Sequence, residues 1–206
     1  MCQRFNTLIL APHIDDEVIG CFTFLKPRTF VHCFGAEDRS YVSRGGRIAE
    51  LAASATKAGF AWHVGEHECQ RYDCSTLIPE IEKKINDLKP KILLIPQPDY
   101  NQDHRAVYDA AIAAMRPHDT NHLVPIVLQY EQPHSLMWPN GSTMREPNYF
   151  QVLDIEAKLQ LYSLYASQVR AHRSPELLTA LARLRGASIK TQFAEAFYCK
   201  RIIASS

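Results

Sequence analysis

The sequence shows no excess of one charge: its 206 residues include 23 lysines and arginines against 22 aspartates and glutamates, a net charge of +1. A chain so evenly balanced has no general field that would gather nucleic acid or an anionic membrane surface. Long apolar runs are also missing, since no segment approaches the ~18 apolar residues needed to cross a bilayer. We therefore expect neither nucleic acid nor a membrane as a partner.

Cysteine pairs and familiar cofactor motifs are absent as well. The six cysteines include no Cys-x-x-Cys pair, which favours reduced thiols in a cytoplasmic protein. The sequence contains no Gly-x-Gly-x-x-Gly, no Walker A run, no His-Glu-x-x-His and no Gly-x-Ser-x-Gly. These absences argue against a dinucleotide oxidoreductase, a P-loop NTPase, a zincin and a common serine hydrolase.

What the sequence does contain is an alternation of short apolar segments with longer amphipathic ones. It predicts strands at residues 7–11, 29–34, 60–64, 91–96, 125–130 and 197–203, and helices at residues 45–58, 75–88, 104–115, 155–167 and 174–184. This order is typical of an α/β fold with a mostly parallel sheet. No linker or repeat divides the chain, so residues 1–206 are expected to form one domain. Residues 131–148, with three prolines and little periodicity, are expected to be a long functional loop.

Three consecutive carboxylates, Asp15, Asp16 and Glu17, follow directly on the first predicted strand. Carboxylates so close together repel one another beside a buried strand unless a positive group compensates them. Ligands of α/β proteins bind at the carboxyl ends of strands, so this is a suitable place for a cation. His13 and Asp16 are ligands that zinc accepts, and a third ligand from elsewhere would leave one coordination position open for water.

A second polar segment, residues 99–105, follows the clearest predicted strand and begins an alanine-rich helix. If the two strands are neighbours, their polar segments converge, and His104 would complete the metal site. The alternative interpretation is that Asp103 is only a helix N-cap and that His104 faces solvent. The presence of His13 and Asp16 in the first segment favours the metal.

Together, the PHIDDE run at residues 12–17 and the NQDHRAVYDAA segment at residues 101–111 resemble the zinc-dependent de-N-acetylases of the LmbE/PIG-L family. The resemblance extends to Arg47-Ile48-Ala49-Glu50 and to the C-terminal part of the chain, and so covers nearly its whole length. It implies a single Rossmann-like three-layer α/β sandwich and one zinc ion per chain. The implied activity is hydrolysis of an N-acetyl group from an acetamido sugar of the N-acetylglucosamine type, or from its conjugate.

The resemblance also assigns roles to the two motifs. By position, His13, Asp16 and His104 would hold the zinc, and Asp15 would be the general base, with Asp103 among the catalytic residues. A carboxylate beside the attacking water can take its proton and return it to the leaving amine. Fe(II), Co(II) or Mn(II) can occupy the same kind of site.

Two positions depart from the family's motifs. Ile14 stands where proline is usual, which removes no ligand. Asn101 stands where many members have the first histidine of His-Pro-Asp-His, which is held to assist the oxyanion. We expect the Asn101 amide to donate in its place, with Tyr100 or His172 as the alternatives.

Substrate contacts are the least defined part of the resemblance. Arginine near a helix start is usually solvated, but the family pattern makes Arg47 a residue that contacts the acyl group or orients a carboxylate. His172 and Arg173 are expected at the mouth of the site. His134 is the one loop histidine expected to reach a substrate, and Trp138 either stacks on a sugar or anchors its loop.

Three functions remain open on the sequence. The first is a cytoplasmic zinc N-deacetylase whose partner is a small acetamido sugar or its conjugate. The second keeps the zinc but acts on another N-acyl group or a non-sugar amide. The third is a metal- or ligand-binding domain without turnover, which Asn101 suggests and Asp15 opposes. The sequence leaves a homo-oligomer possible without specifying one.

Overall fold

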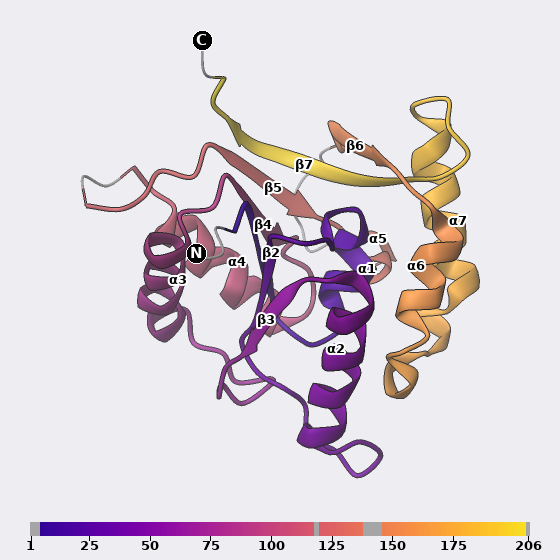
Figure 1. Cartoon of the computed structure of the whole chain (residues 1–206), viewed down its shortest axis with the longest axis horizontal. Coiled ribbons are helices and arrows are strands. Elements are labelled where there is room, and N and C mark those ends of the chain that lie inside the picture. The colour runs from indigo at the N-terminus through magenta and orange to yellow at the C-terminus, as the bar shows by residue number, and fades with distance from the viewer. Residues whose placement is uncertain (1–4, 118–119, 138–145, 205–206) are drawn as a thin grey trace.

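The computed structural model describes residues 5–117, 120–137 and 146–204, which are built around one seven-stranded sheet (Figure 1). The strands are β1 (Thr7–Ala11), β2 (Thr29–Cys33), β3 (Ala61–Val64), β4 (Ile92–Pro96), β5 (Ile126–Tyr130), β6 (Tyr149–Val152) and β7 (Ala194–Ile202). Their order is β3-β2-β1-β4-β5-β7-β6. The first five are parallel, and β7 runs antiparallel to both of its neighbours. The predicted α/β fold with a mostly parallel sheet is confirmed.

The helices begin at residues that suit a first turn. They are α1 (Asp16–Cys21), α2 (Arg44–Ala58), α3 (Cys74–Leu88), α4 (Gln102–Ala114), α5 (Pro133–Met137), α6 (Ile155–Tyr162) and α7 (Pro175–Ala187), with short 3₁₀ turns η1 (Phe22–Phe24), η2 (Ala166–Gln168) and η3 (Ala171–Arg173). Side-chain oxygens cap five of them, at Ser43, Asp73, Asn101, Asp154 and Ser174. Gly59 ends α2 in the left-handed region, at φ 83°. No helix within these residues is long and apolar enough to cross a membrane.

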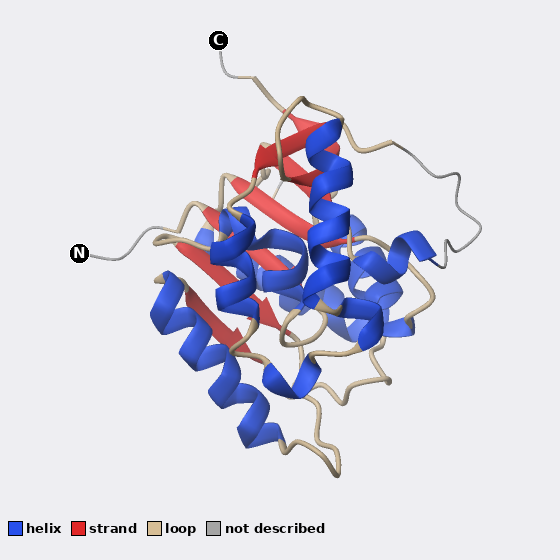
Figure 2. Ribbon diagram, turned by 90° about the vertical axis from the view of Figure 1, so that its right-hand side faces the viewer, coloured by secondary structure: helices blue, strands red, loops and turns tan. Residues whose placement is uncertain are grey.

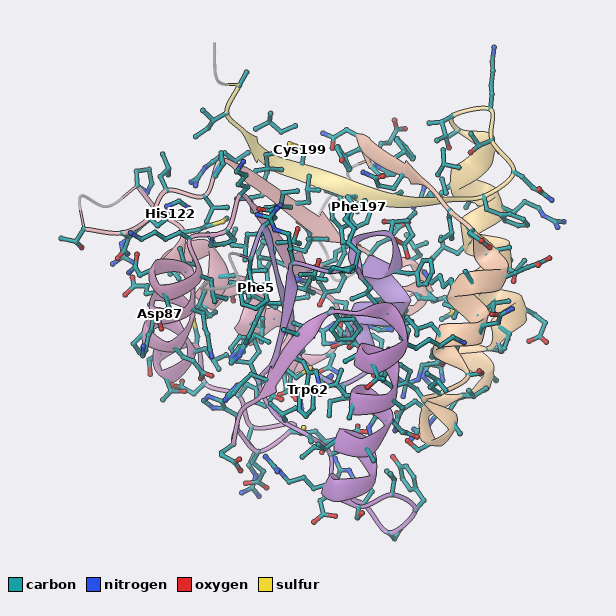
Figure 3. All side chains as sticks on the ribbon, in the orientation of Figure 1. Phe5, Trp62, Asp87, His122, Phe197 and Cys199 are labelled. Carbon is teal, nitrogen blue, oxygen red and sulfur yellow. The ribbon has the colours of Figure 1, made fainter. Side chains whose placement is uncertain are left out.

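Helices cover both faces of the sheet, because alternate strand residues point to opposite sides. Figure 2 shows helices on both sides of the strands. In β1, Ile9 and Ala11 belong to the hydrophobic cluster that includes residues of α1, α2 and α6, whereas Leu8 and Leu10 belong to the cluster with α3 and α4. Phe197 of β7 is fully buried in the first cluster, with its ring 5.3 Å from that of Phe24 (Figure 3). The sheet is therefore buried on both sides.

Three parts of the secondary structure differ from the sequence prediction. The expected long loop at residues 131–148 contains α5, and residues 138–145, with Trp138, lie outside the described residues. The six-residue α1 and the four-residue β6 are too short to show a period in the sequence. The predicted helix at residues 155–167 ends at Tyr162, and the chain continues into η2.

Close packing between α1 and β5 depends on Gly20. A Cβ atom at this position would lie 2.4 Å from Cδ2 of Tyr130, and the Tyr130 hydroxyl is itself fixed by donating to the Leu10 carbonyl at 2.9 Å. We expect Gly20→Ala to destabilise the protein by about 1–3 kcal/mol, because a well-packed core must shift to make room. Urea unfolding measures the change. Gly45→Ala is the control, since a Cβ there has only the Ser43 Oγ near it, at 3.9 Å. A Gly20→Ala variant that unfolds at the wild-type urea concentration would contradict the close packing of Gly20 against Tyr130.

Candidate metal centre and active site

Two polar segments meet at the carboxyl ends of β1 and β4, which pair directly. In the first, Asp15 is the N-cap of α1 with a left-handed backbone, at φ 104°. In the second, Asn101 is the N-cap of α4, and its Oδ1 accepts a hydrogen bond from Asp103 N at 2.9 Å. This edge lies where helices leave the sheet toward opposite faces, the usual place for a site in an α/β fold.

His13, Asp16 and His104 form a compact group of potential ligands, with one ligand atom of each within 4.8 Å of the others. Asp16 Oδ2 is 3.7 Å from His13 Nδ1 and 3.5 Å from His104 Nε2. Asp16 is held in place by Gln132, whose Nε2 donates to Asp16 Oδ1 at 2.6 Å. Asp16 and His104 are each 2% exposed. Two imidazole nitrogens and one carboxylate oxygen are a donor set that fits zinc.

Each histidine of this group has a second carboxylate behind it. His13 Nε2 is 2.8 Å from Asp103 Oδ2, and His104 Nδ1 is 2.9 Å from Asp99 Oδ2. An N–H donated outward fixes the ring and leaves the other nitrogen, Nδ1 of His13 or Nε2 of His104, with its lone pair toward Asp16. Asp103 is itself held by the backbone N–H of Gln70 at 2.6 Å. These contacts support the metal-ligand geometry of both rings.

Asp99, His104 and His134 form a second group with the spacing of metal ligands. His134 Nε2 is 2.9 Å from Asp99 Oδ2, the oxygen that also faces His104 Nδ1. His104 cannot donate Nδ1–H to Asp99 and offer the same nitrogen to a metal. We therefore interpret Asp99 as the carboxylate that orients His104, with His134 as its second partner.

Asp15 faces two arginines instead of the metal ligands. Its Oδ2 is 2.9 Å from Nη1 of Arg173, and its Oδ1 is 3.3 Å from Nη2 of Arg47. Its backbone N–H donates to Glu17 Oε2 at 3.0 Å. A non-glycine residue in this conformation stores strain, and such residues concentrate at functional sites. The neighbours Asp15 and Asp16 thus have different surroundings, one between arginines and one between histidines.

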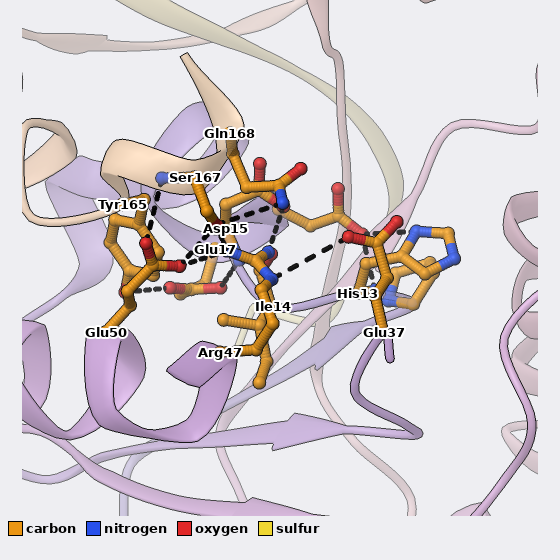
Figure 4. A network of polar contacts seen from close by, with 12 residues as sticks. His13, Ile14, Asp15, Glu17, Glu37, Arg47, Glu50, Tyr165, Ser167 and Gln168 are labelled. Carbon is orange, nitrogen blue, oxygen red and sulfur yellow. Dashed lines mark hydrogen bonds and ion pairs between the residues drawn. The ribbon is translucent and has the colours of Figure 1, made fainter. Parts of the chain in front are cut away.

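Arg47 is fully buried, although its place near a helix start suggests a surface residue. It extends from α2 toward Asp15, as Figure 4 shows, with Glu37 on one side and Glu50 on the other. Its Nη1 donates to Glu50 Oε2 at 2.5 Å and to Ser167 Oγ at 3.2 Å, and its Nη2 donates to the Ile14 carbonyl. The guanidinium therefore joins the strand-end loop, α2 and η2.

Burial and neighbouring charges set the protonation of these groups. Burial raises the pKa of Asp15, while Arg173 and Arg47 oppose the rise. Burial raises the pKa of Glu17 to about 7, despite the hydrogen bond that it accepts from the Tyr165 hydroxyl. Burial acts to lower the pKa of His104, but the carboxylate of Asp16 and then that of Asp99 raise it to about 10. The pocket around His104 therefore favours a positive charge.

Solved structures of other proteins share this fold. No protein-family model and no curated protein matches the sequence. N,N'-diacetylchitobiose deacetylase from Pyrococcus horikoshii, solved with an inhibitor, aligns with a TM-score of 0.75 and 19% identity over 94% of this chain and 83% of its own. Deacetylases of teicoplanin biosynthesis and of the A40926 pseudoaglycone align similarly. This chain has the fold of these deacetylases.

Two further neighbours show what the fold alone leaves open. A conserved protein from Thermus thermophilus has a TM-score of 0.78 and 18% identity, over 98% of this chain and 97% of its own. The 4-carboxy-2-hydroxymuconate hydratase from Pseudomonas putida has a TM-score of 0.72 and 18% identity, over 98% and 99%. The deacetylase fold therefore also occurs in an enzyme with a different reaction, so the choice of activity depends on the site.

The other residues singled out in the sequence lie around this centre. Tyr100 is 52% exposed, with its ring 5.6 Å from that of His134. His172 lies exposed on η3, and its neighbour Arg173 turns inward to Asp15. The oxyanion role expected of the Asn101 amide stays a prediction, and the observed role of its Oδ1 is to cap α4.

Sequence reasoning did not identify three supporting residues: Asp99, Gln132 and Gln168. Asp99 orients His104, Gln132 holds Asp16, and Gln168 Oε1 accepts from Arg173 Nη2 at 2.7 Å. Asp99 stands at the start of the second polar segment, and this position was a usable signal. Gln132 lies 116 positions from Asp16 along the chain, and no local pattern marks it. Gln168 lies five positions from Arg173, but its sequence neighbourhood does not indicate that it holds this arginine.

Proposed function

We propose that this chain is a zinc-dependent N-deacetylase of the LmbE/PIG-L family that acts on an acetamido sugar of the N-acetylglucosamine type or its conjugate. The observation that carries the proposal is the ligand group His13, Asp16 and His104, with the buried carboxylate of Asp15 next to Asp16 in the chain. A binding site alone has no need of a buried carboxylate beside its ligands. The fold neighbours of this chain include a zinc-inhibited form of a teicoplanin deacetylase, which is consistent with a metal in this fold.

Zinc bound by these three residues would lower the pKa of a water molecule and polarise the acyl carbonyl. The chain's own residues then divide the remaining work. Asp15 accepts the proton of the attacking water and later donates it to the leaving nitrogen. Burial raises the pKa of Asp15 and so makes it a better base, while Arg173 and Arg47 favour its charged form and oppose the rise. Asp99 and Asp103 hold the two imidazoles in place.

Acetate release and metal content test this proposal together. The purified protein is stripped with a chelator, reloaded with zinc, and assayed on N-acetylglucosamine, N,N'-diacetylchitobiose and N-acetylglucosaminides. We expect about one zinc per chain and release of acetate only from the reloaded protein. One zinc per chain without release from any of these compounds would contradict the deacetylase.

The fold shared with a hydratase makes a second activity worth measuring. A panel of longer N-acyl sugars, non-sugar amides and unsaturated carboxylates distinguishes an amidohydrolase of other specificity from a hydratase. Substrate binding at zinc saturation with no turnover of any compound would favour the third possibility, a binding domain.

We further predict that Asp99→Asn weakens zinc binding about 10–100-fold, the usual cost of losing a carboxylate that orients a ligating histidine. Asp99 is 1% exposed and its Oδ2 faces both His104 and His134, so the change removes the charge on which both rings depend. Competition with a chromogenic chelator measures the affinity. Asp87→Asn is the matched control, since Asp87 is exposed and pairs with Lys83 on α3. Equal affinities in the two variants would overturn the assignment of Asp99.

A further inference from the structure

Arg173 has an unused donor beside the proposed base. Its Nη1 contacts Asp15 Oδ2 at 2.9 Å and its Nη2 donates to Gln168 Oε1 at 2.7 Å. Its Nε is buried and has no partner within the described residues. Leaving a buried donor without a partner is unfavourable, and proteins rarely keep such a donor without a use.

The residues otherwise expected to stabilise an oxyanion are neutral, engaged or exposed. Asn101 Oδ1 caps α4, which leaves only its neutral Nδ2 as a donor, and His134 Nε2 is bound to Asp99. Tyr100 is 52% exposed, and His172 is exposed on η3. Arg47 is the other cation at Asp15, and its Nε is also buried without a hydrogen bond. That Nε lies 3.7 Å from Glu37 Oε2, and both terminal nitrogens of Arg47 are already bonded. The Arg47 side chain is only 1% exposed, whereas that of Arg173 is 15% exposed and is the more accessible to a substrate. Of the described groups around Asp15, the Arg173 guanidinium best combines a fixed positive charge with a free donor.

We propose that Arg173 is the catalytic residue that stabilises the negative charge developing on the substrate's carbonyl oxygen. This inference rests on the proposed deacetylase function and specifies a part of it that the sequence leaves to Asn101. In the attack, the water oxygen bonds to the acyl carbon, the C=O π pair moves to oxygen, and Asp15 takes the proton. In the collapse, that pair re-forms C=O, the C–N bond breaks, and the proton passes from Asp15 to nitrogen.

The contact between Arg173 and Asp15 explains why an arginine suits this role. Proton uptake neutralises Asp15 at the moment when an equal negative charge appears on the carbonyl oxygen. A guanidinium that touches both positions stays paired with a negative charge throughout, and its planar set of donors needs no rearrangement. Gln168 holds the guanidinium in place meanwhile.

The test compares Arg173→Ala, Arg173→Lys and Arg170→Ala in zinc-loaded protein. Arg170 is the matched control, because it is exposed on the same segment and lies over the Tyr41 ring at 5.1 Å. We expect Arg173→Ala to lose about 10²–10³-fold in kcat with little change in KM, the usual effect of removing one oxyanion donor. Added guanidinium ion should restore part of the lost rate, and Arg173→Lys should retain part of it.

A binding measurement separates this role from a structural one. Calorimetry with the methylphosphonamidate of glucosamine, whose tetrahedral phosphorus carries a charged oxygen, should show a loss of affinity in Arg173→Ala parallel to the loss in kcat. Affinity for the product glucosamine should stay near that of the wild type. Equal losses for both ligands, or an unchanged kcat, would overturn the role of Arg173. Absence of acetate release by the wild type would instead overturn the deacetylase function itself.

Discussion

Replacing Asp15 by asparagine is expected to lower kcat about 10²–10⁴-fold while zinc remains bound. Asp15 is the strand-end carboxylate that contacts Arg47 and Arg173, whereas Asp16 lies between His13 and His104. Glu17 accepts from the Tyr165 hydroxyl instead. Asparagine keeps an oxygen for the arginines and tolerates the left-handed backbone at this position. It cannot accept the proton of water, so the chemical step should fail and the fold should persist. Steady-state kinetics on the best acetamido substrate, with zinc content measured alongside, provide the test.

Stability must be followed in the same variant, because Asp15 also compensates two buried cations. Thermal unfolding of Asp15→Asn and of the wild type shows whether a lost rate comes from a lost base or a lost fold. Glu66→Gln is a suitable control, since Glu66 is exposed and pairs only with Arg44 among the described ion pairs. A well-folded, zinc-loaded Asp15→Asn protein with near wild-type kcat would contradict the assignment of the base.

Arg47→Met is expected to have the largest effect on stability, a loss of about 3–5 kcal/mol in the free energy of unfolding. Removing one partner of a buried ion pair leaves the other charge without compensation, and that loss dominates. Here the substitution removes the hydrogen bonds from Arg47 to Glu50 and to the Ile14 carbonyl, and the ion pair between Arg47 and Asp15. Methionine fills much of the same volume, so a packing defect contributes little. Urea unfolding monitored by circular dichroism measures the change.

Arg44→Met on the same helix is the comparison for this experiment. The Arg44 side chain is 36% exposed and pairs with Glu66, which is 85% exposed, so its loss should cost about 0–1 kcal/mol. If the two variants unfold at the same urea concentration, the buried network around Arg47 does not stabilise the fold as described.

The predictable part of this molecule is the part encoded in local sequence. The apolar runs at β1 and β4 are short and unbroken, and each is followed at once by a polar motif. Because parallel strands align their carboxyl ends, pairing β1 with β4 is enough to bring His13 and His104 together. The histidine rings lie 5.4 Å apart, although 91 positions separate them in the sequence.

The unpredicted part depends on contacts that no local pattern encodes. Arg47 follows two glycines near a helix start, where a charged residue ordinarily faces water, and its burial results from Ser167 and Glu50 closing over it. Likewise α5 is a five-residue helix that begins at a proline, too short to leave a periodic signal. Gln132 precedes it and reaches Asp16 only because β5 ends next to the metal ligands.

The ligand group and the surroundings of Asp15 and Glu17 differ in how far apart their residues lie along the chain. This difference implies an order in which they form during folding. The ligand group needs only residues up to His104, which lie in the loop after β1, in α1 and in α4, among the elements synthesised first. Apart from Arg47, the side chains that restrain Asp15 and Glu17 come much later, with Arg173 at a separation of 158 residues and Tyr165 at 148. Contacts this distant form late in folding, because their loops are the costliest to close. If the proposed metal site is correct, we expect a nascent chain to be able to bind the metal before the C-terminal segment docks and completes the surroundings of Asp15.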